Sequence, residues 1–317
     1  MAVYTQVSAE AMAEFIARYE VGTLASAKGI AEGVENSNYL VDTSGRDGKG
    51  ARFILTLYEK RVDAADLPFF AALLDHLAER GCAVPRMLRD RQGEQLRTLC
   101  GRPAALIEFL PGLSVSHPTA TQARATGAAL GRIHMALADF ALNRANALGP
   151  EGWYALAAKC GVSLDDIQPG LRAKVEAECA YLKAHWPAAL PRAVIHADLF
   201  PDNVLMRGVA VSGLIDFYFA ATEVRAWDVA VTHAAWAFDY EGRNYDAAVG
   251  DAIIAGYDAT HGLSAAERAA FPILARGACL RFLLTRAWDW LNTPAEALVT
   301  RKDPLAFLRR LEHYNAL

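Results

Sequence analysis

The segment 194–220 holds three oxygen-bearing side chains whose types and spacing suit the transfer of a phosphoryl group. It reads VIHADLFPDNVLMRGVAVSGLIDFYFA, with Asp198 two residues after His196, Asn203 five residues after Asp198, and Asp216 thirteen residues further on. A carboxylate at Asp198 can orient a substrate hydroxyl or accept its proton. The amide oxygen of Asn203 and the carboxylate of Asp216 are hard ligands of the kind that Mg²⁺ prefers. We therefore expect Asp198 to be catalytic and Asn203 and Asp216 to hold Mg²⁺.

The residues around these side chains predict a strand, a loop and a hairpin. A short apolar run at 194–195 precedes the loop, and two strand-like runs at 204–206 and 211–215 flank a Gly-containing turn. Such a hairpin brings Asn203 and Asp216 together, and His196 is expected to orient the loop backbone. A single aspartate is weak evidence, because such residues often cap helices or form turns. The joint pattern, His-x-Asp-x₄-Asn, a hairpin and then Ile-Asp, is typical of a kinase catalytic loop and its metal-binding aspartate.

The rest of the chain predicts a β-rich first part and a mainly helical second part. The predicted strands cover 28–43, 51–60, 86–89, 95–99 and 104–109. The predicted helices cover 8–20, 66–80, 119–138, 169–186, 280–291 and 303–314. Pro111 and Gly112 interrupt the strand pattern before the helices begin. We expect an α+β protein with an N-terminal nucleotide-binding lobe over 1–107, a hinge over 108–112, and a C-terminal catalytic and substrate-binding lobe over 113–317.

Composition and charge exclude several classes of protein. Hydrophobic residues make up 53% of the 317 residues and charged residues 21%, which is ordinary for a globular enzyme with a sizeable core. A net charge of −4 lacks the basic footprint of a nucleic-acid-binding protein. The five cysteines are widely spaced and form no Cys-x-x-Cys pair, so they predict neither a zinc knuckle nor a redox motif. We see neither a signal peptide nor a membrane-spanning run, and expect a cytoplasmic protein with no membrane partner.

Three motifs resemble those of a known family. They are GVENSNY at 33–39, FILTLYEKR at 53–61 and HADLFPDNVL…GLIDFYFA at 196–220. The last is similar to the catalytic core of the aminoglycoside-phosphotransferase and choline-kinase branch of the protein-kinase-like fold. Within that branch, all three resemble the homoserine kinases that use this fold. The resemblance covers essentially the whole chain. It implies a bilobal protein-kinase-like fold and ATP-dependent phosphorylation of L-homoserine to O-phospho-L-homoserine, a step of threonine biosynthesis.

The resemblance also implies roles for residues outside the catalytic loop. Asp228 matches a helical aspartate that supports the loop, and ATP is expected to contact the turn at 33–39 and the hinge. The residues implied for ATP are Gly33, Asn36, Ser37, Asn38, Lys60, Glu108 and Leu110. One position departs from the family pattern, because Thr56 stands where related kinases carry a phosphate-binding lysine on the third strand. Lys60 is the candidate replacement, and the alternative is that it is a solvated residue at the end of the strand.

The expected substrate is a zwitterion, so its carboxylate requires a cation such as the planar fork of an arginine. Arg281 and Arg286 lie on one predicted helix and are the candidates, with a salt bridge between helices as the alternative for each. Kinases of the same fold that act on choline, an aminoglycoside, methylthioribose or a sugar stay open as alternatives. A nucleotide-binding module without activity is a further one. We expect ATP and Mg²⁺ as cofactors, no nucleic-acid partner, and a monomer or homodimer.

Overall fold

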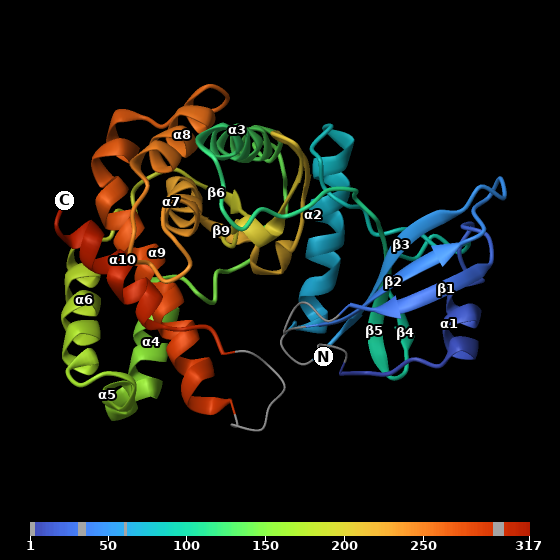
Figure 1. Ribbon diagram of the computed structural model, residues 1–317, viewed down its shortest axis with the longest axis horizontal. Helices are drawn as coiled ribbons and strands as arrows, with labels where there is room; N and C mark the ends of the chain where they lie inside the picture. Colours follow the sequence, from blue (N-terminus) through green and yellow to red (C-terminus); the bar gives the residue numbers. More distant parts are fainter. Residues whose placement is uncertain (1–3, 31–35, 60–61, 294–300) are drawn as a thin grey trace. The chain divides into compact units, whose positions relative to one another are not determined.

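The computed structural model describes residues 4–30, 36–59, 62–293 and 301–317. The chain divides into two compact units, Met1–Pro111 and Gly112–Leu317. This division falls inside the interval 108–112, where we placed the hinge. Strands predominate in the first unit and helices in the second, and Figure 1 shows both sets of elements along the chain.

The first unit contains a five-stranded antiparallel sheet with the strand order β1-β2-β3-β5-β4. Its elements are α1 (Ala9–Ile16), β1 (Leu24–Gly29), β2 (Asn36–Thr43), β3 (Ala51–Tyr58), α2 (Leu67–Glu79), β4 (Arg97–Leu99) and β5 (Arg102–Glu108). The strand predicted over 86–89 is instead a single bridge between Met87 and Ile107. Pro85, which has no N–H group, stands directly before this segment and cannot donate to a longer ladder.

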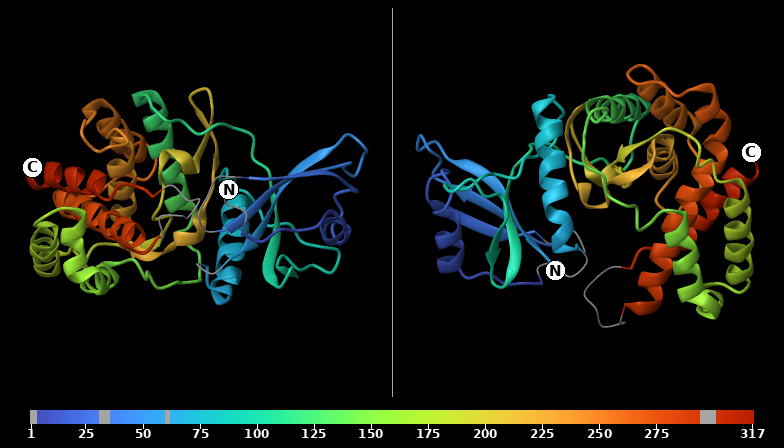
Figure 2. Two further views of the ribbon diagram at one scale, coloured as in Figure 1. Left: turned by 60° about the horizontal axis from the view of Figure 1, so that its bottom comes forward. Right: turned by 180° about the vertical axis from the view of Figure 1, so that it is seen from behind.

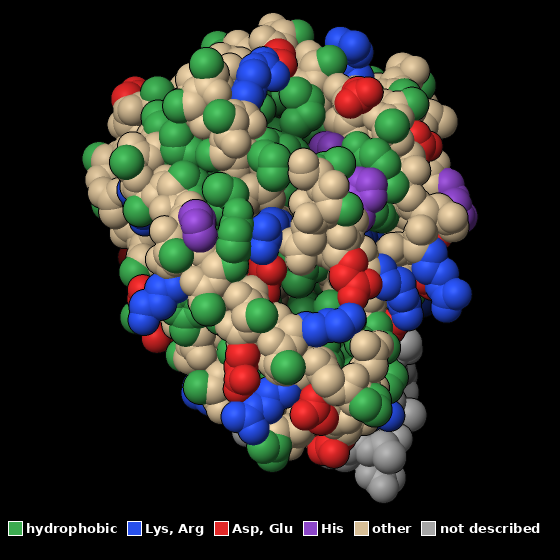
Figure 3. Space-filling model, turned by 90° about the vertical axis from the view of Figure 1, so that its left-hand side faces the viewer, with side chains coloured by type: hydrophobic (Ala, Val, Ile, Leu, Met, Phe, Trp, Pro, Cys, Tyr) green, Lys and Arg blue, Asp and Glu red, His purple; other side chains and the backbone are tan. Residues whose placement is uncertain are grey.

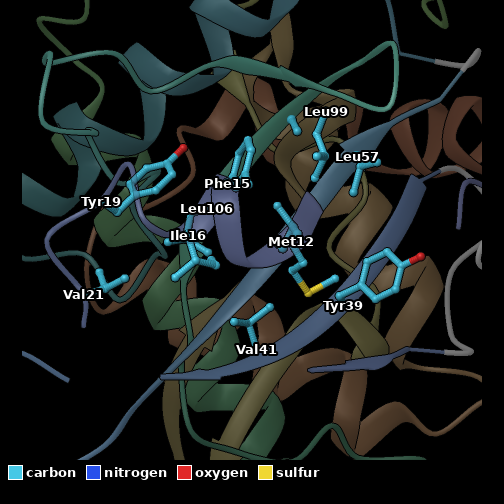
Figure 4. Close-up of a cluster of buried hydrophobic side chains, with 12 residues drawn as sticks. Met12, Phe15, Ile16, Tyr19, Val21, Tyr39, Val41, Leu57, Leu99 and Leu106 are labelled. Atoms are coloured by element: carbon cyan, nitrogen blue, oxygen red, sulfur yellow. The ribbon is translucent and has the colours of Figure 1, made fainter. Parts of the chain in front are cut away.

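The core of the first unit forms where α1 packs against the sheet. Ser8 caps α1 by accepting a hydrogen bond from the N–H of Ala11 at 3.2 Å. The apolar face predicted for this helix is confirmed, since Met12, Phe15 and Ile16 are all buried. Figure 4 shows these side chains together with the sheet residues that they contact, which include Tyr39, Val41, Leu57 and Leu106. Burial of these side chains stabilises the packing of β2 and β3, and these two strands include residues that we assign to ATP binding.

The second unit is mainly helical and contains two short two-stranded sheets. Its helices are α3 (Ala120–Ala136), α4 (Pro150–Cys160), α5 (Leu164–Ile167), α6 (Leu171–His185), α7 (Arg225–Trp236), α8 (Ala247–Asp258), α9 (Ala265–Asn292) and α10 (Leu305–Asn315). Its strands are β6 (Arg192–Ile195), β7 (Val204–Arg207), β8 (Ala210–Leu214) and β9 (Ala221–Val224). β6 pairs with β9 and β7 pairs with β8, both antiparallel. In Figures 1 and 2 the pair β6–β9 lies beside α3 and α7 of the same unit.

Glycines allow α3 and α8 to approach each other closely. A Cβ atom added at Gly127 would lie 2.1 Å from the carbonyl oxygen of Ile253, and one added at Gly256 would lie 2.0 Å from that of Arg124. Any other residue at these positions would force the helices apart. Their approach sets Tyr257 of α8 against His134 of α3, with Tyr257 Oη 2.9 Å from His134 Nδ1. This contact orients His134, whose Nε2 lies 3.1 Å from Asp228 of α7.

Surface chemistry adds two observations. None of the helices in the described part of the chain is long and apolar enough to cross a bilayer. On the face drawn in Figure 3, basic and acidic side chains are interspersed among apolar and neutral ones.

Candidate active site

The hairpin β7–β8 brings Asn203 next to the residue that precedes Asp216. Val204 pairs with Leu214, and the N–H of Ile215 donates to the carbonyl oxygen of Asn203 at 3.0 Å. The predicted hairpin is therefore confirmed. Asp216 follows in the left-handed region, with φ at 65°, and its side chain is exposed. The hairpin thus delivers both oxygen-bearing residues to the same end of one small sheet.

Asn203 also binds Asp198, the aspartate expected to be catalytic. Its amide nitrogen donates to the carbonyl oxygen of Asp198 at 2.7 Å and to the Asp198 carboxylate at 3.2 Å. Because the nitrogen makes both bonds, the amide oxygen is the Asn203 atom that suits a cation. The structure therefore joins Asn203 to Asp198 by side-chain hydrogen bonds and to the residue before Asp216 by a backbone hydrogen bond.

The side-chain oxygens of Asn203 and Asp216 suit a magnesium ion that arrives with a phosphorylated nucleotide. Mg²⁺ is usually held by one or two protein carboxylates together with phosphate oxygens and waters, not by an all-protein cage. Across the described residues, no cluster of three or more His, Cys, Asp or Glu side chains could hold a metal by itself. The amide oxygen of Asn203 and the carboxylate of Asp216 are oxygen donors of the kind that such a shared ion accepts.

A buried carboxylate on α7 holds the backbone of the catalytic loop. Asp228 has no exposed surface and accepts the N–H groups of His196 at 2.7 Å and Ala197 at 2.8 Å. His134 Nε2 lies 3.1 Å from the same carboxylate. Burial alone would raise the pKa of Asp228, but His134 and the loop N–H groups lower it overall. An ionised Asp228 thus stabilises Ala197 in a left-handed conformation, with φ at 65°.

His196 links the loop to the end of β8 through backbone contacts. Its Nε2 lies 3.0 Å from the carbonyl oxygen of Ile215, and its Nδ1 accepts the N–H of Asp198 at 3.2 Å. Burial lowers the pKa of His196, so the ring is neutral and carries its proton on Nε2. The ring also packs against Phe217, with 4.4 Å between ring centres. These contacts support the loop-orienting role that we expected of His196.

Arg281 contacts the opposite side of the loop from within the protein. Only 2% of the residue is exposed, and its guanidinium donates to the carbonyl oxygen of Ala197. Its Nη2 lies 4.0 Å from Asp198 Oδ1, and its guanidinium carbon lies 4.4 Å from the centre of the Phe282 ring. Arg281 is one of the two candidates for the substrate carboxylate, and in the structure its guanidinium binds the backbone of the loop. The periodicity of α9 gave no sign of which loop this side chain would meet.

Two further contacts fix the loop and were not predicted. Trp236 Nε1 donates to the carbonyl oxygen of Leu199 at 2.9 Å. Phe200 packs edge-on against Phe282, with ring centres 4.8 Å apart, and lies 6.0 Å from the Phe307 ring of α10. Aromatic side chains of α9 and α10 therefore anchor the residues that follow Asp198. Sequence shows that these residues are apolar, but it does not show which partners they meet.

The environment of Asp198 makes its carboxylate a stronger base than that of a free aspartate. Burial raises the pKa of Asp198 to about 8, Arg281 opposes this shift, and Asp216 and Asp202 reinforce it. The side chain nevertheless keeps 17% of its surface exposed, enough to meet a small substrate. A carboxylate whose pKa lies near neutrality suits a group that takes up a proton from a hydroxyl.

The residues of the first unit that we expect to contact ATP differ in burial and in hydrogen-bond partners. Gly33 and Lys60 lie outside the described residues. Ser37 is fully buried, and its hydroxyl accepts the N–H groups of Tyr4 at 2.8 Å and Thr5 at 3.0 Å and donates to Glu59 at 2.8 Å. These contacts engage the Ser37 hydroxyl inside the unit, and the ATP contact expected of this residue stays a prediction.

The neighbouring polar residues of β2 line up with β3. Asn36 is 5% exposed, and its amide oxygen lies 3.4 Å from the N–H of Glu59. Asn38 pairs with Thr56 in the sheet, and its amide oxygen accepts the Thr56 hydroxyl at 2.7 Å. Thr56, which stands where related kinases carry a lysine, is therefore uncharged and hydrogen-bonded to Asn38.

The remaining expected residues lie at the ends of their elements. Glu108 ends β5, and its carboxylate accepts the N–H of Arg86 at 3.0 Å. Leu110 follows two residues later and is half-buried. Arg286 is half-buried on α9, with its guanidinium donating to the carbonyl oxygen of Asp303 at 3.2 Å.

Comparisons with known proteins identify relatives along the full length of the chain. Residues 26–267 match the family model described as the phosphotransferase enzyme family. A homoserine kinase of Zymomonas mobilis subsp. mobilis is 54% identical, over 99% of this chain and 97% of its own length. A homoserine kinase of Azorhizobium caulinodans is 52% identical, over 100% of this chain and 97% of its own length.

Solved structures of more distant proteins show the same fold. An amicoumacin kinase in complex with AMP-PNP and Ca²⁺ superposes with a TM-score of 0.74 at 14% identity, covering 98% of this chain and 94% of its own. A spectinomycin phosphotransferase in complex with ADP superposes with a TM-score of 0.68 at 12% identity, covering 98% of this chain and 95% of its own. These likenesses confirm the α+β protein-kinase-like fold expected from the sequence.

Proposed function

This chain belongs to the phosphotransferase enzyme family, and from that premise we propose that it is an ATP-dependent kinase of a small alcohol, L-homoserine. It transfers the γ-phosphoryl group of ATP to the side-chain hydroxyl and yields O-phospho-L-homoserine and ADP. The substrate follows from relatives that share more than half of its residues over nearly the whole chain and are homoserine kinases. This makes the chain an enzyme of threonine biosynthesis.

The observation that carries the mechanism is the contact between Asp198 and Asn203. The Asn203 amide nitrogen donates a hydrogen bond to the Asp198 carboxylate at 3.2 Å. The Asn203 carbonyl oxygen accepts the N–H of Ile215, the residue before Asp216, at 3.0 Å. The proton acceptor and the cation ligands are thus held as one unit. In phosphoryl transfer most of the rate enhancement comes from such positioning and from charge stabilisation.

Asp198 acts on the substrate hydroxyl in this proposal. The hydroxyl oxygen forms a bond to the γ-phosphorus as the bond to the β,γ-bridging oxygen breaks, and the hydroxyl proton passes to Asp198. Arg281 and Asp228 act indirectly, since both bind the backbone of Ala197, the residue before Asp198. They are positioning residues that fix where the carboxylate lies.

Asn203 and Asp216 are the residues that would hold Mg²⁺. When bound, the ion neutralises the charge that develops on the transferring phosphoryl group. The amide oxygen of Asn203 and the exposed carboxylate of Asp216 supply ligands for it.

We place contacts with ATP at Asn36, Asn38 and the segment from Glu108 to Leu110. The Thr56 hydroxyl is bound to Asn38 at 2.7 Å and brings no charge to the phosphates. Related kinases supply a positive charge from the strand position that Thr56 occupies here. We propose that Lys60 supplies the positive charge for the phosphates in its place.

A coupled ADP-release assay with MgATP tests the proposed function. L-homoserine, D-homoserine, L-serine, L-threonine, choline and kanamycin would be compared as acceptors at equal concentration. We expect kcat/KM for L-homoserine to exceed that for every other acceptor by at least about 100-fold, because a site built for polar groups rejects analogues that leave them unpaired. Preference for choline or kanamycin would keep the kinase chemistry and reject homoserine. Turnover of none of them would favour a nucleotide-binding module.

A further inference from the structure

The proposed substrate carries a carboxylate that needs a cation within reach of Asp198, and this inference rests on that proposed function. Helix α9 contacts the catalytic loop, and two of its four arginines, Arg281 and Arg286, lie five residues apart in its C-terminal half. A guanidinium binds a carboxylate best through two parallel hydrogen bonds, which requires that its outer N–H groups be accessible. The contacts of the two arginines differ in this respect.

Arg281 is not accessible to a substrate. It is 2% exposed and donates to the carbonyl oxygen of Ala197. Aromatic rings surround its guanidinium carbon, with the centre of Phe219 at 5.2 Å, Trp227 at 5.7 Å and Phe282 at 4.4 Å. Its charge is used to hold the loop.

Arg286 has a different set of contacts. It is half-buried, and its guanidinium donates to one backbone carbonyl oxygen, that of Asp303, at 3.2 Å. The Asp303 carboxylate lies 3.3 Å from Arg309 instead. No carboxylate among the described residues lies within ion-pair distance of Arg286. A cation in such a position is costly unless an anion pairs with it.

The aromatic cluster beside the catalytic loop locates Arg286. Its guanidinium carbon lies 4.6 Å from the centre of the Phe307 ring, and that ring contacts Phe200 of the loop at 6.0 Å. A second cation, Arg310, lies 4.3 Å from the same ring centre. Arg310 is 3% exposed, and its Nε and Nη1 have no hydrogen-bond partner within the described part of the chain. One ring therefore lies beside two positive charges, neither of which forms an ion pair with a carboxylate among the described residues.

The electrostatics agree with this geometry. Burial lowers the pKa of Arg286 to about 10, and the positive charge of Arg310 acts in the same direction. The carboxylates of Asp198 and Asp303 act in the opposite direction. An incoming carboxylate would relieve the repulsion between the two arginines.

We propose that Arg286 binds the α-carboxylate of the amino-acid substrate, in a positive field that Arg310 strengthens. The planar guanidinium pairs with the carboxylate, while the side-chain hydroxyl of the substrate extends to Asp198. This assigns substrate selection to Arg286 and loop positioning to Arg281. It predicts that an amino acid is preferred over an amino alcohol of the same length.

The test combines a change in the protein with a change in the ligand. R286A and R286K would be compared with the wild type for kcat and KM toward L-homoserine. The inhibition constants of 3-aminopropan-1-ol and L-homoserinamide, which lack the carboxylate charge, would be measured in parallel. R268A is the matched control, because Arg268 lies on the same helix and pairs with Asp258 at 2.5 Å. Thermal unfolding would show that each variant is folded, and R286Q would replace R286A if the latter is not.

We expect R286A to lose about 10- to 100-fold in kcat/KM for L-homoserine, mainly through KM, because a charge-assisted pair is lost. The inhibition constants of the two analogues should change less than about 3-fold, R286K should retain part of the affinity, and R268A should match the wild type. An R286A activity within twofold of wild type would overturn the assignment, as would equal losses for homoserine and the analogues. A wild type that does not phosphorylate L-homoserine would overturn the proposed function itself.

Discussion

Replacing Asp228 by asparagine tests whether the catalytic loop depends on one buried carboxylate. Asp228 is fully buried and accepts the N–H groups of His196 and Ala197 at 2.7 and 2.8 Å, with His134 at 3.1 Å. Asparagine keeps one acceptor oxygen but turns an N–H₂ group toward one of these donors. Hydrogen bonds to a charged group contribute about 1.5–3 kcal/mol each, so D228N should lower the free energy of unfolding by about 2–4 kcal/mol.

Activity should fall with stability, because the same bonds position Asp198. A displacement of about 1 Å in a catalytic group can cost about 100-fold, so we expect D228N to lose about that factor in kcat with little change in KM for ATP. Urea unfolding and steady-state kinetics would measure both effects. D251N, which changes an exposed carboxylate on α8, should stay within about 0.5 kcal/mol of the wild type. A D228N protein that matches this control in stability and in kcat would refute the reasoning.

The pH dependence of stability provides a second readout of the same group. The folded pKa of Asp228 lies below its ordinary value. Its contribution to stability is therefore present above the unfolded pKa of about 4 and is lost as the pH falls through the lower folded pKa. D228N should remove this part of the acid-unfolding limb, and an unchanged limb would show that Asp228 is not the ionised group in the folded protein.

Two further predictions concern backbone strain and a buried histidine. Ala197 has φ at 65°, a conformation that costs an alanine about 1–2 kcal/mol, so A197G should raise the free energy of unfolding by about 0.5–1 kcal/mol. A220G, at an ordinary φ of −57°, should lower the free energy of unfolding. Thermal unfolding would measure both variants, and a destabilised A197G would contradict the idea that Ala197 is strained. Burial lowers the pKa of His233 to about 4 from 6.5, so the unfolded chain takes up the proton first and the free energy of unfolding should fall by roughly 3 kcal/mol between about pH 7 and pH 4. H233N should flatten that slope in urea unfolding at several pH values, and an equal slope in both proteins would exclude His233 as its source.

The sequence predicted those parts of the site that depend on local structure. The hairpin that joins Asn203 to the residue before Asp216 follows from the strand-like runs around Gly208. The face of α1 and the cap at Ser8 followed from helical periodicity and capping chemistry. Short-range rules determine such features, so no knowledge of packing was needed.

Features that depend on long-range packing were missed. Arg281 was placed among substrate ligands because helical periodicity gives the face of α9 but not its neighbour, and that neighbour is the Ala197 carbonyl. Ser37 was assigned to ATP, but residues more than thirty positions earlier in the chain bind its hydroxyl. His134 reaches Asp228 because glycines at 127 and 256 bring α3 and α8 together. Each of these contacts joins segments whose proximity is a property of the whole fold.

The measurement that tests the central claim most directly is product formation by D198N. Phosphorus NMR would follow O-phospho-L-homoserine formed from ATP and L-homoserine, and calorimetry would measure the dissociation constant of MgATP for both proteins. Because asparagine keeps the shape of Asp198 but cannot take up the hydroxyl proton, we predict a loss in kcat of about 100- to 10,000-fold with nucleotide affinity unchanged. A D198N enzyme that retains a tenth or more of wild-type kcat would contradict the assignment of Asp198 as the group that acts on the substrate hydroxyl.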